Sequence, residues 1–200
     1  GDMIERREAI AAILQDRPDN LLVISGLGSP TYDVAAAGDV AQNFYLWGAM
    51  GGAASMGLGL ALARPDARVL VITGDGEMLM GMGSLATLGA KAPHNLAVLV
   101  IDNEAFGETG GQTSHTGKTT NLAAVALACG FKQVSTVHKQ QELAGLRQLL
   151  LDVTGPVLGV IKTAAGELPR VLPERDGHII RNTFKTAIST NTNRKTGDLK

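Results

Sequence analysis

The feature that most constrains this chain is a series of short, uninterrupted apolar runs separated by segments of helical length. These runs cover residues 21–25, 68–73, 96–101 and 157–162. Such runs are typical of parallel strands that helices cover on both faces, and the crossovers between parallel strands are right-handed. The sequence therefore predicts an α/β fold of three layers, α/β/α, with a mostly parallel sheet.

The remainder of the chain is expected to continue this alternation of strands and helices. Helices are expected at residues 4–16, 50–63, 78–91, 121–128 and 140–151. A further strand is expected at residues 131–136, a turn at residues 26–30, and a long polar loop at residues 102–120.

We expect one folded domain followed by an extension. A length of 200 residues corresponds to about one ordinary domain, which we place at residues 1–170. Residues 171–200 are expected to form a C-terminal extension that begins with a short helix at 177–188. The polar composition from Asn191 onward predicts a disordered tail.

Charge and cysteine content exclude several classes of function. The net charge is −1, so no long-range field attracts nucleic acid or an anionic membrane. The longest apolar candidate, residues 50–63, is shorter than the roughly 18 residues of a membrane span, and the first residues lack the apolar stretch of a signal peptide. The single cysteine, Cys129, cannot form an intramolecular disulfide. We therefore expect a cytoplasmic protein, and we interpret Gly1 and Asp2 before Met3 as a cloning remnant.

The segment Gly74-Asp75-Gly76-Glu77 lies directly after the strand at 68–73. In open parallel sheets, ligands bind at the carboxyl ends of the strands. Glycines there allow backbone N–H groups to approach a phosphate, and a carboxylate can hold a divalent cation beside it. A glycine turn with an N-capping Asp75 is the alternative interpretation.

Two further strand ends carry candidate residues. Asn103 follows the next strand, so Asn103 and Asp75 are expected to face one cation, although an Asx turn is the alternative for Asn103. Gly48 and Met50 open the small-residue helix at 50–63 and indicate backbone brought close to a planar ligand. Ordinary packing is the alternative for Met50.

Other signals are weaker. A dinucleotide fingerprint starting at Gly26 fails because Thr31 occupies its last position, and a phosphate-binding loop ending at 117–119 fails because Gln112 replaces its first glycine. His115 lies on the polar loop, where a neutral imidazole can transfer protons near neutral pH. We interpret the remaining histidines as surface or structural residues: His94, His138 and His178.

The segment Gly74-Asp75-Gly76, followed after 26 residues by Asn103, resembles the diphosphate-binding signature of thiamine-diphosphate enzymes. The resemblance runs from about Ile4 to Arg181. It implies that residues 1–170 form a thiamine-diphosphate-binding domain of the diphosphate type. It also implies Mg²⁺ as a second cofactor, held by Asp75, Asn103 and the backbone carbonyl of Ala105.

The resemblance further implies contacts with thiamine diphosphate. The carbonyl of Gly48 would receive the aminopyrimidine, Met50 would support the thiazolium ring, and Gly76 with Glu77 would offer N–H groups to the diphosphate. His115 is the candidate for substrate contact or proton transfer. The full set of cofactor-binding residues that the resemblance implies is Gly48, Met50, Gly74, Gly76, Glu77 and Phe106. Phe106 departs from the family, in which Tyr is frequent, and Asp102 replaces the first residue of a common Asn pair.

Within this family, the strings GDGEMLM at 74–80, SLAT at 84–87 and GETGGQTSHT at 107–116 look most like phosphonopyruvate and sulfopyruvate decarboxylases. Family members also have a pyrimidine domain whose Glu contacts the cofactor, and 200 residues leave no room for it. The resemblance therefore implies a hetero-oligomer in which a separate alpha subunit supplies that Glu. Glu77 cannot replace it, because Glu77 lies at the diphosphate end of the cofactor.

The function that the resemblance implies is that of the cofactor-anchoring subunit of a 2-oxoacid decarboxylase. Its substrate would resemble 3-sulfopyruvate or 3-phosphonopyruvate, and its products would be an aldehyde and CO₂. The alternatives are a subunit of an acetolactate-synthase-like carboligase, a subunit of a dehydrogenase or oxidase, and a non-catalytic sensor of thiamine diphosphate.

Overall fold

The computed structural model describes residues 3–197, with side chains described as far as Ser189. Its centre is a parallel sheet of six strands in the order β2-β1-β3-β4-β8-β7. The strands are β1 Leu21–Ser25, β2 Asn43–Tyr45, β3 Arg68–Gly74, β4 Leu96–Asp102, β7 Gln133–Val137 and β8 Val157–Lys162. Gly1 and Asp2, which we interpreted as a cloning remnant, lie outside the described residues.

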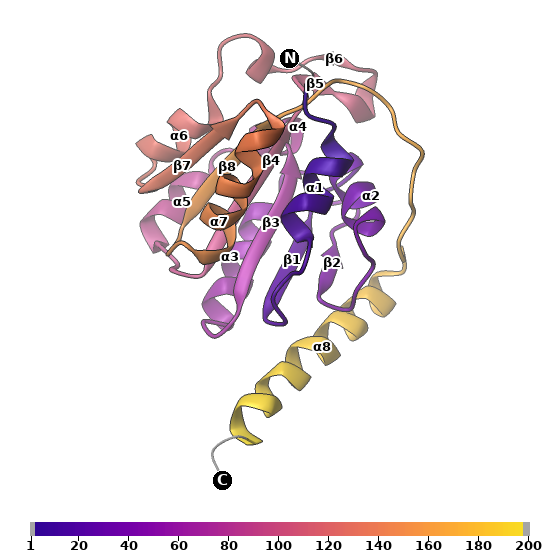
Figure 1. Cartoon of the computed structure of the whole chain (residues 1–200), viewed down its shortest axis with the longest axis vertical. Coiled ribbons are helices and arrows are strands. Elements are labelled where there is room, and N and C mark those ends of the chain that lie inside the picture. The colour runs from indigo at the N-terminus through magenta and orange to yellow at the C-terminus, as the bar shows by residue number, and fades with distance from the viewer. Residues whose placement is uncertain (1–2, 198–200) are drawn as a thin grey trace.

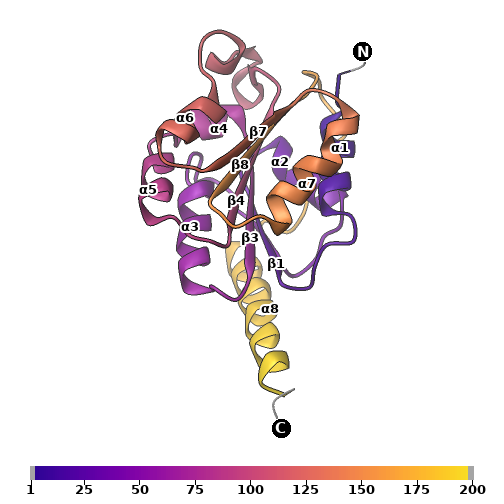
Figure 2. The ribbon, with the colours of Figure 1, turned by 60° about the vertical axis from the view of Figure 1, so that its left-hand side comes forward.

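Helices cover both faces of this sheet (Figure 2). One layer consists of α1 Arg6–Leu14, α2 Ser29–Ala36 and α7 Leu143–Asp152. The opposite layer consists of α3 Ala53–Ala63, α4 Asp75–Met80, α5 Ser84–Lys91 and α6 Leu122–Ala128. The three-layer α/β/α architecture predicted from the apolar runs is confirmed.

The central strands explain why those runs are continuous. Leu70 and Ile72 of β3 belong to the core beneath α1, α2 and α7, whereas Val69 and Val71 belong to the core beneath α3 to α6. All four are fully buried. Since successive side chains of a strand point to opposite faces, a strand covered on both sides requires apolar residues at every position.

Two predicted helices differ from the structure. The helix expected at 78–91 is two helices, α4 and α5, because the chain turns at Gly81–Gly83, where a Cβ on Gly81 would overlap the Gly51 carbonyl. The helix expected to begin at Met50 begins at Ala53, after a turn in which Gly51 has a φ of +87°.

Two elements near the N-terminus were not predicted. The turn expected at 26–30 leads directly into α2, where Pro30 lies in the first turn of the helix, a position at which its missing N–H costs nothing. The strand β2 has only three residues and is too short to produce a recognisable pattern.

The polar loop at 102–120 contains regular structure. Its strands β5 Ala105–Phe106 and β6 Gln112–Thr113 pair as an antiparallel hairpin. Short 3₁₀ turns, Gly107–Thr109 and His115–Gly117, accompany them. A third 3₁₀ turn, Gln140–Glu142, precedes α7.

The C-terminal extension starts as a connection from the top of the sheet that runs down the side of the body to α8 (Figure 1). Trp47 Nε1 donates to the carbonyl of Glu174 on this connection at 2.9 Å. Helix α8 spans Gly177–Gly197 and projects beyond the body, and Phe184 packs edge-on against Phe44. The helix therefore extends past residue 188, where we expected it to end, whereas the expectation of a disordered tail from Asn191 onward stays a prediction. Residues 198–200 lie outside the described range.

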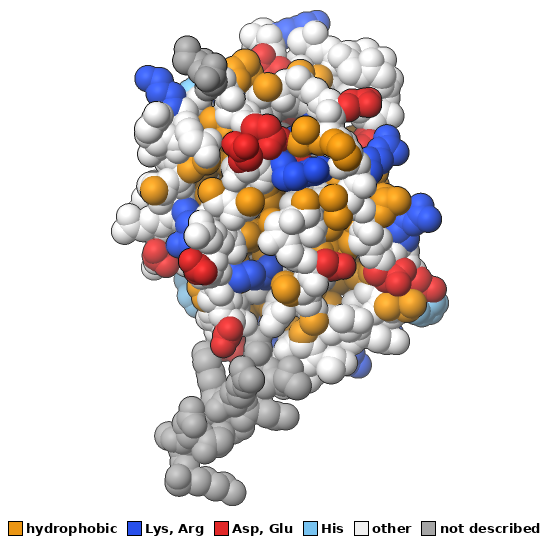
Figure 3. Space-filling model, turned by 45° about the vertical axis from the view of Figure 1, so that its right-hand side comes forward, with side chains coloured by type: hydrophobic (Ala, Val, Ile, Leu, Met, Phe, Trp, Pro, Cys, Tyr) orange, Lys and Arg blue, Asp and Glu red, His pale blue; other side chains and the backbone are white. Residues whose placement is uncertain are grey.

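The surface carries charges of both signs. Acidic and basic side chains lie interspersed on the face that Figure 3 shows, in keeping with the net charge of −1. Within residues 3–197, no helix combines the length and the apolar character that crossing a membrane would require.

Candidate functional site

A cleft opens at the carboxyl ends of β1, β3 and β4, beneath the β5–β6 hairpin. This is the edge where loops and helix N-termini meet in a parallel sheet. The cleft is lined by most of the residues singled out from the sequence: Met50, Gly74, Asp75, Gly76, Glu77, Asn103, Ala105 and Phe106. Gly48 and His115 do not line it.

Asp75 is the first residue of α4, and only 2 % of it is exposed. Its Oδ2 atom accepts hydrogen bonds from the hydroxyls of Ser114 and Thr116. Burial raises the pKa of the Asp75 carboxyl; the Ser114 hydroxyl opposes this shift, and the nearby Asp102 carboxylate adds to it. Asp75 has no cationic partner among the described residues, so a cation from outside the chain would favour its ionised form.

The hydroxyls of Ser114 and Thr116 reach Asp75 because the β5–β6 hairpin brings the chain back to the end of β4. The pairing of Ala105 with Thr113 and the hydrogen bond from Ser114 N–H to the Glu104 carbonyl, at 2.8 Å, place Ser114 beside the end of β4. Sequence reasoning missed Ser114 and Thr116. The run Thr113-Ser114-His115-Thr116 drew attention to its histidine, although the hydroxyls on either side of it are the groups that contact the acid.

Thr116 also connects Asp75 to a second acid. Its Oγ1 lies 3.1 Å from Asp75 Oδ2 and 2.7 Å from Asp102 Oδ1, so its single proton serves one carboxylate at a time. Asp102 pairs through Oδ2 with Lys162 Nζ at 2.8 Å, and Lys162 also reaches Glu104 at 2.7 Å. Asp102 therefore has a cationic partner within the chain, which it shares with Glu104.

Asn103 adopts the Asx turn that was its alternative interpretation, because its Oδ1 accepts the Ala105 N–H at 3.1 Å. An amide oxygen has two lone pairs, so this hydrogen bond leaves one for a cation. No cluster of three or more His, Cys, Asp or Glu side chains suited to a metal exists within the described part of the chain. A cation here would rely on Asp75, on the amide and carbonyl oxygens of Asn103 and Ala105, and on oxygens of a ligand.

Glu77 lies in α4 and is buried, with 4 % of its surface exposed. Its Oε1 accepts the Gly51 N–H at 3.3 Å, whereas Oε2 lies against Gly26 and has no hydrogen-bond partner. Burial raises the pKa of this carboxyl, and neighbouring N–H groups oppose the shift. A side chain on Gly26 would displace the carboxyl, so these two positions depend on each other.

The remaining candidates border an apolar hollow next to the cleft. This hollow is lined by Met50, Phe106 and His115. The rings of Phe106 and His115 pack edge-on, with their centroids 5.8 Å apart. Met50 is 37 % exposed and belongs to neither main core cluster, which argues against the packing interpretation of this residue. A Cβ on Gly76 would approach the Phe106 ring to 2.8 Å, so this ring can pack closely on the start of α4 because residue 76 is glycine.

Comparisons with known proteins agree with this geometry. The family model "Thiamine pyrophosphate enzyme, C-terminal TPP binding domain" matches residues 26–161. The sulfopyruvate decarboxylase subunit beta of Methanocaldococcus jannaschii is 42 % identical over 132 residues, which are 66 % of this chain and 70 % of that protein.

A longer relative and a solved structure extend the comparison. The phosphonopyruvate decarboxylase of Streptomyces viridochromogenes is 39 % identical over 173 residues, which are 84 % of this chain but only 43 % of that protein. A structure described as a thiamin diphosphate-dependent enzyme from Mycobacterium smegmatis superposes with a TM-score of 0.71 at 18 % identity, over 82 % of this chain and 32 % of the other. That likeness shows the fold.

The family match runs from Gly26, directly after β1, to Ile161 in β8, and it includes the glycines, Asp75 and Asn103 that line the cleft. The chain therefore belongs to the thiamine pyrophosphate enzymes, and residues 26–161 are its C-terminal TPP-binding domain.

Proposed function

We propose that this chain is the cofactor-anchoring subunit of a thiamine-diphosphate-dependent 2-oxoacid decarboxylase that acts on a 3-sulfo- or 3-phosphonopyruvate-like substrate. The observation that carries the proposal is the buried Asp75, which lacks a cationic partner among the described residues and lines one cleft with Asn103. Support for the substrate class comes from relatives named sulfopyruvate decarboxylase subunit beta and phosphonopyruvate decarboxylase.

The residues of the cleft fit a diphosphate with its cation. Gly74 and Gly76 line the cleft at the start of α4 and have no side chain, so that backbone N–H groups can approach phosphate oxygens. Asp75, Asn103 and the Ala105 carbonyl supply the hard oxygen ligands that Mg²⁺ prefers. Mg²⁺ is therefore part of the proposal.

Thiamine diphosphate, when bound, supplies the chemistry that removes CO₂ from a 2-oxoacid. The chain's own residues hold and shape it. Met50 limits where the ring system can lie, Gly48 offers a backbone carbonyl, and Phe106 shields the cleft from water. His115, beside Phe106, is the proposed proton carrier at its imidazole nitrogens.

The proposal includes a partner. The name "subunit beta" of several relatives supports a separate alpha subunit, which would supply the catalytic Glu and complete a hetero-oligomer. Exposed apolar side chains beside the cleft suit such an interface: Met80 is 68 % exposed and Met50 is 37 % exposed. We place the complex in the cytoplasm because the single Cys129 fits a reducing compartment.

The test is to co-purify the chain with its partner and assay a panel of 2-oxoacids with saturating cofactor and Mg²⁺. Aldehyde and CO₂ from a sulfonated or phosphonated substrate are expected, and the chain alone should be nearly inactive. A ligated product would favour the carboligase alternative, and cofactor binding without turnover would favour the sensor. Full turnover by the chain alone would contradict the requirement for a partner.

A further inference from the structure

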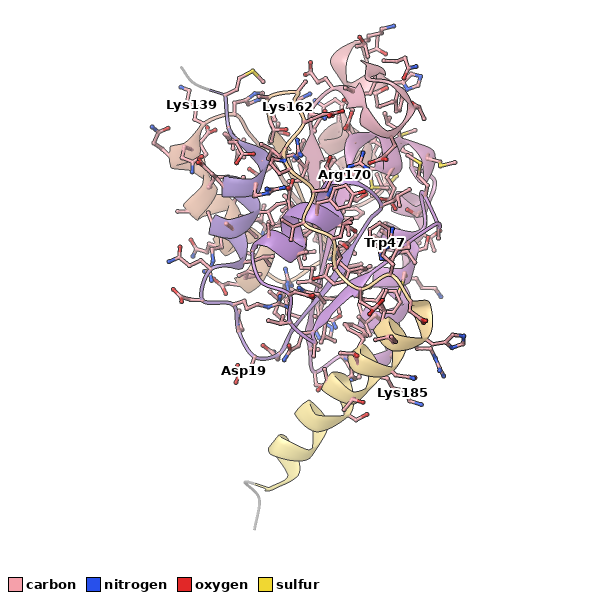
Figure 4. The ribbon with its side chains drawn as sticks, turned by 90° about the vertical axis from the view of Figure 1, so that its right-hand side faces the viewer. Asp19, Trp47, Lys139, Lys162, Arg170 and Lys185 are labelled. Atoms are coloured by element: carbon pink, nitrogen blue, oxygen red, sulfur yellow. The ribbon has the colours of Figure 1, made fainter. Side chains whose placement is uncertain are left out.

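A second hollow lies directly beside the cofactor cleft. The wall that the two spaces share is formed by the residues that line both of them: Arg6, Ser29, Asn103, Ala105, Gly107 and Glu108. Arg170 lines only the second hollow, on the connection that runs in front of α1 and α2 (Figure 4). Neither arginine was singled out from the sequence.

Arg6 is held rigidly in this wall. It is only 6 % exposed, its Nε donates to Asp33 Oδ2 at 2.7 Å, and its Nη1 donates to the Gly166 carbonyl. A guanidinium has donors on three nitrogens, and the hydrogen bonds of Arg6 use only two of them. Within residues 3–189, Nη2 therefore has no hydrogen-bond partner, although its side chain lines the cleft.

The charges around Arg6 leave an excess of positive charge. Asp33 is fully buried and is shared between Arg6 and Arg7, whose Nε lies 2.9 Å from Asp33 Oδ1. Two guanidinium groups thus share one carboxylate, and a buried charge without full compensation is costly. The positive charge of Arg6 therefore lies in the wall of the cleft, where it would stabilise a negatively charged ligand.

Arg170 extends this positive wall outward. Its guanidinium lies 5.6 Å from the centre of the Tyr32 ring and forms no ion pair with an acid of the described residues. Two acids also border this region: Glu167 lines the second hollow, and Glu108 lines both the hollow and the cofactor cleft. Both are exposed, and neither forms a salt bridge with Arg6 or Arg170. The first turn of α2, at Ser29, has no side-chain cap and faces the same space.

We propose that Arg6, assisted by Arg170, binds a tetrahedral oxyanion at the boundary between the two spaces. The planar guanidinium suits phosphate, phosphonate and sulfonate groups, to which it can donate two parallel hydrogen bonds. This inference rests on the proposed function, in which two ligands carry such an oxyanion. The bound group is either the diphosphate of the cofactor or the distal sulfonate or phosphonate of the substrate.

The test compares Arg6→Gln with Arg7→Gln in the 200-residue chain by titration calorimetry. Arg7 pairs with the same Asp33 but does not line either space, so Arg7→Gln controls for loss of the buried ion pair. Arg6→Lys keeps the charge and loses the planar fork, and melting temperatures of all variants verify folding. The first probe is inorganic pyrophosphate with Mg²⁺, and the second is 3-sulfopropanoate added to chain saturated with thiamine diphosphate and Mg²⁺.

Arg6→Gln should weaken one of the two probes by about tenfold or more, the loss expected for a charge-assisted hydrogen bond. Arg7→Gln should change it by less than about twofold, and Arg6→Lys and Arg170→Gln should give intermediate losses. Weakened pyrophosphate binding identifies the cofactor's diphosphate as the oxyanion, whereas weakening of 3-sulfopropanoate alone identifies the substrate's sulfonate.

Equal effects of Arg6→Gln and Arg7→Gln on both probes would overturn the inference while leaving the proposed function intact. If the wild-type chain binds neither pyrophosphate nor thiamine diphosphate in the presence of Mg²⁺, both the inference and the proposed function are wrong.

Discussion

Two buried aspartates beside the cleft have opposite electrostatic surroundings. Asp33 on α2 is fully buried and forms ion pairs with Arg6 and Arg7. Asp75 at the start of α4 is 2 % exposed, and its described neighbours are two hydroxyls and a second carboxylate. Burial of a carboxylate is tolerated where the chain supplies the counter-charge, so Asp33 stabilises the fold. Asp75 lacks such a counter-charge, and this difference marks it as a site for an external cation.

The largest effect is expected at Asp33. Asp33→Asn leaves two guanidinium groups facing a neutral amide, so the free energy of unfolding should fall by about 3–5 kcal/mol, as for other broken buried ion pairs. Asp75→Asn should leave the free energy of unfolding unchanged or raise it in the absence of metal, because no cationic side chain of the protein loses a partner. Urea unfolding of both variants in a chelator measures the contrast. Similar losses in the two variants would show that Asp75 is also a structural residue.

Binding of the cofactor should show the reverse order. Asp75→Asn removes the charged ligand proposed for Mg²⁺, so the affinity for thiamine diphosphate with Mg²⁺ should fall on the order of 100-fold. Calorimetry with and without Mg²⁺ measures this effect, with Asp102→Asn as the comparison because Asp102 carries the same charge but pairs with Lys162. If Asp75→Asn binds the cofactor with unchanged Mg²⁺ dependence, the cation does not lie at Asp75.

A smaller effect is expected from the hydroxyls that hold Asp75. Ser114→Ala removes the donor to Oδ2, so the carboxylate loses its fixed orientation and Mg²⁺ affinity should fall about tenfold, in the range found for residues that support metal ligands. Thr113→Ala is the matched control, since Thr113 is exposed in the same hairpin and has no side-chain hydrogen bond to Asp75. Equal affinities for the two variants would limit Ser114 to a role in folding the hairpin.

The sequence predicted most of the sheet because β1, β3, β4 and β8 are apolar at nearly every position, which only strands covered on both faces require. The candidate residues Asp75 and Asn103 were also identifiable, since each directly follows such a strand. What escaped prediction depends on contacts between distant segments. Ser114 reaches Asp75 only through the pairing within the hairpin.

Arg6 escaped prediction for a similar reason. It borders the cleft only because Ile4 forms a parallel bridge with Thr163 at the end of β8, which brings the start of the chain to the ligand-binding edge of the sheet. No local pattern around residue 6 encodes a contact with a segment almost the whole chain away. An arginine in the first turn of an amphipathic helix therefore gave no signal of a binding role.

The smallest predicted effect is the pH dependence of stability in the metal-free chain. Burial raises the pKa of Asp75 above the ordinary value of 3.8, so the folded chain binds this proton more tightly than the unfolded chain does. Between the two pKa values the native state carries more protons, and the free energy of unfolding therefore decreases as pH rises through that window. Asp33 differs from Asp75 in having two charged partners, Arg6 and Arg7.

The measurement is the difference in unfolding free energy between wild type and Asp75→Asn, followed upward from pH 3.8 in a chelator. Glu77 is present in both proteins and its pKa is also raised by burial, so the difference isolates the contribution of Asp75. Wild type should lose stability relative to the variant as pH rises, and saturating Mg²⁺ should reduce that loss because the cation favours the ionised carboxylate. A difference that stays flat with pH, or one that Mg²⁺ leaves unchanged, would mean that the buried carboxylate obtains its compensation from within the chain, as Asp33 does.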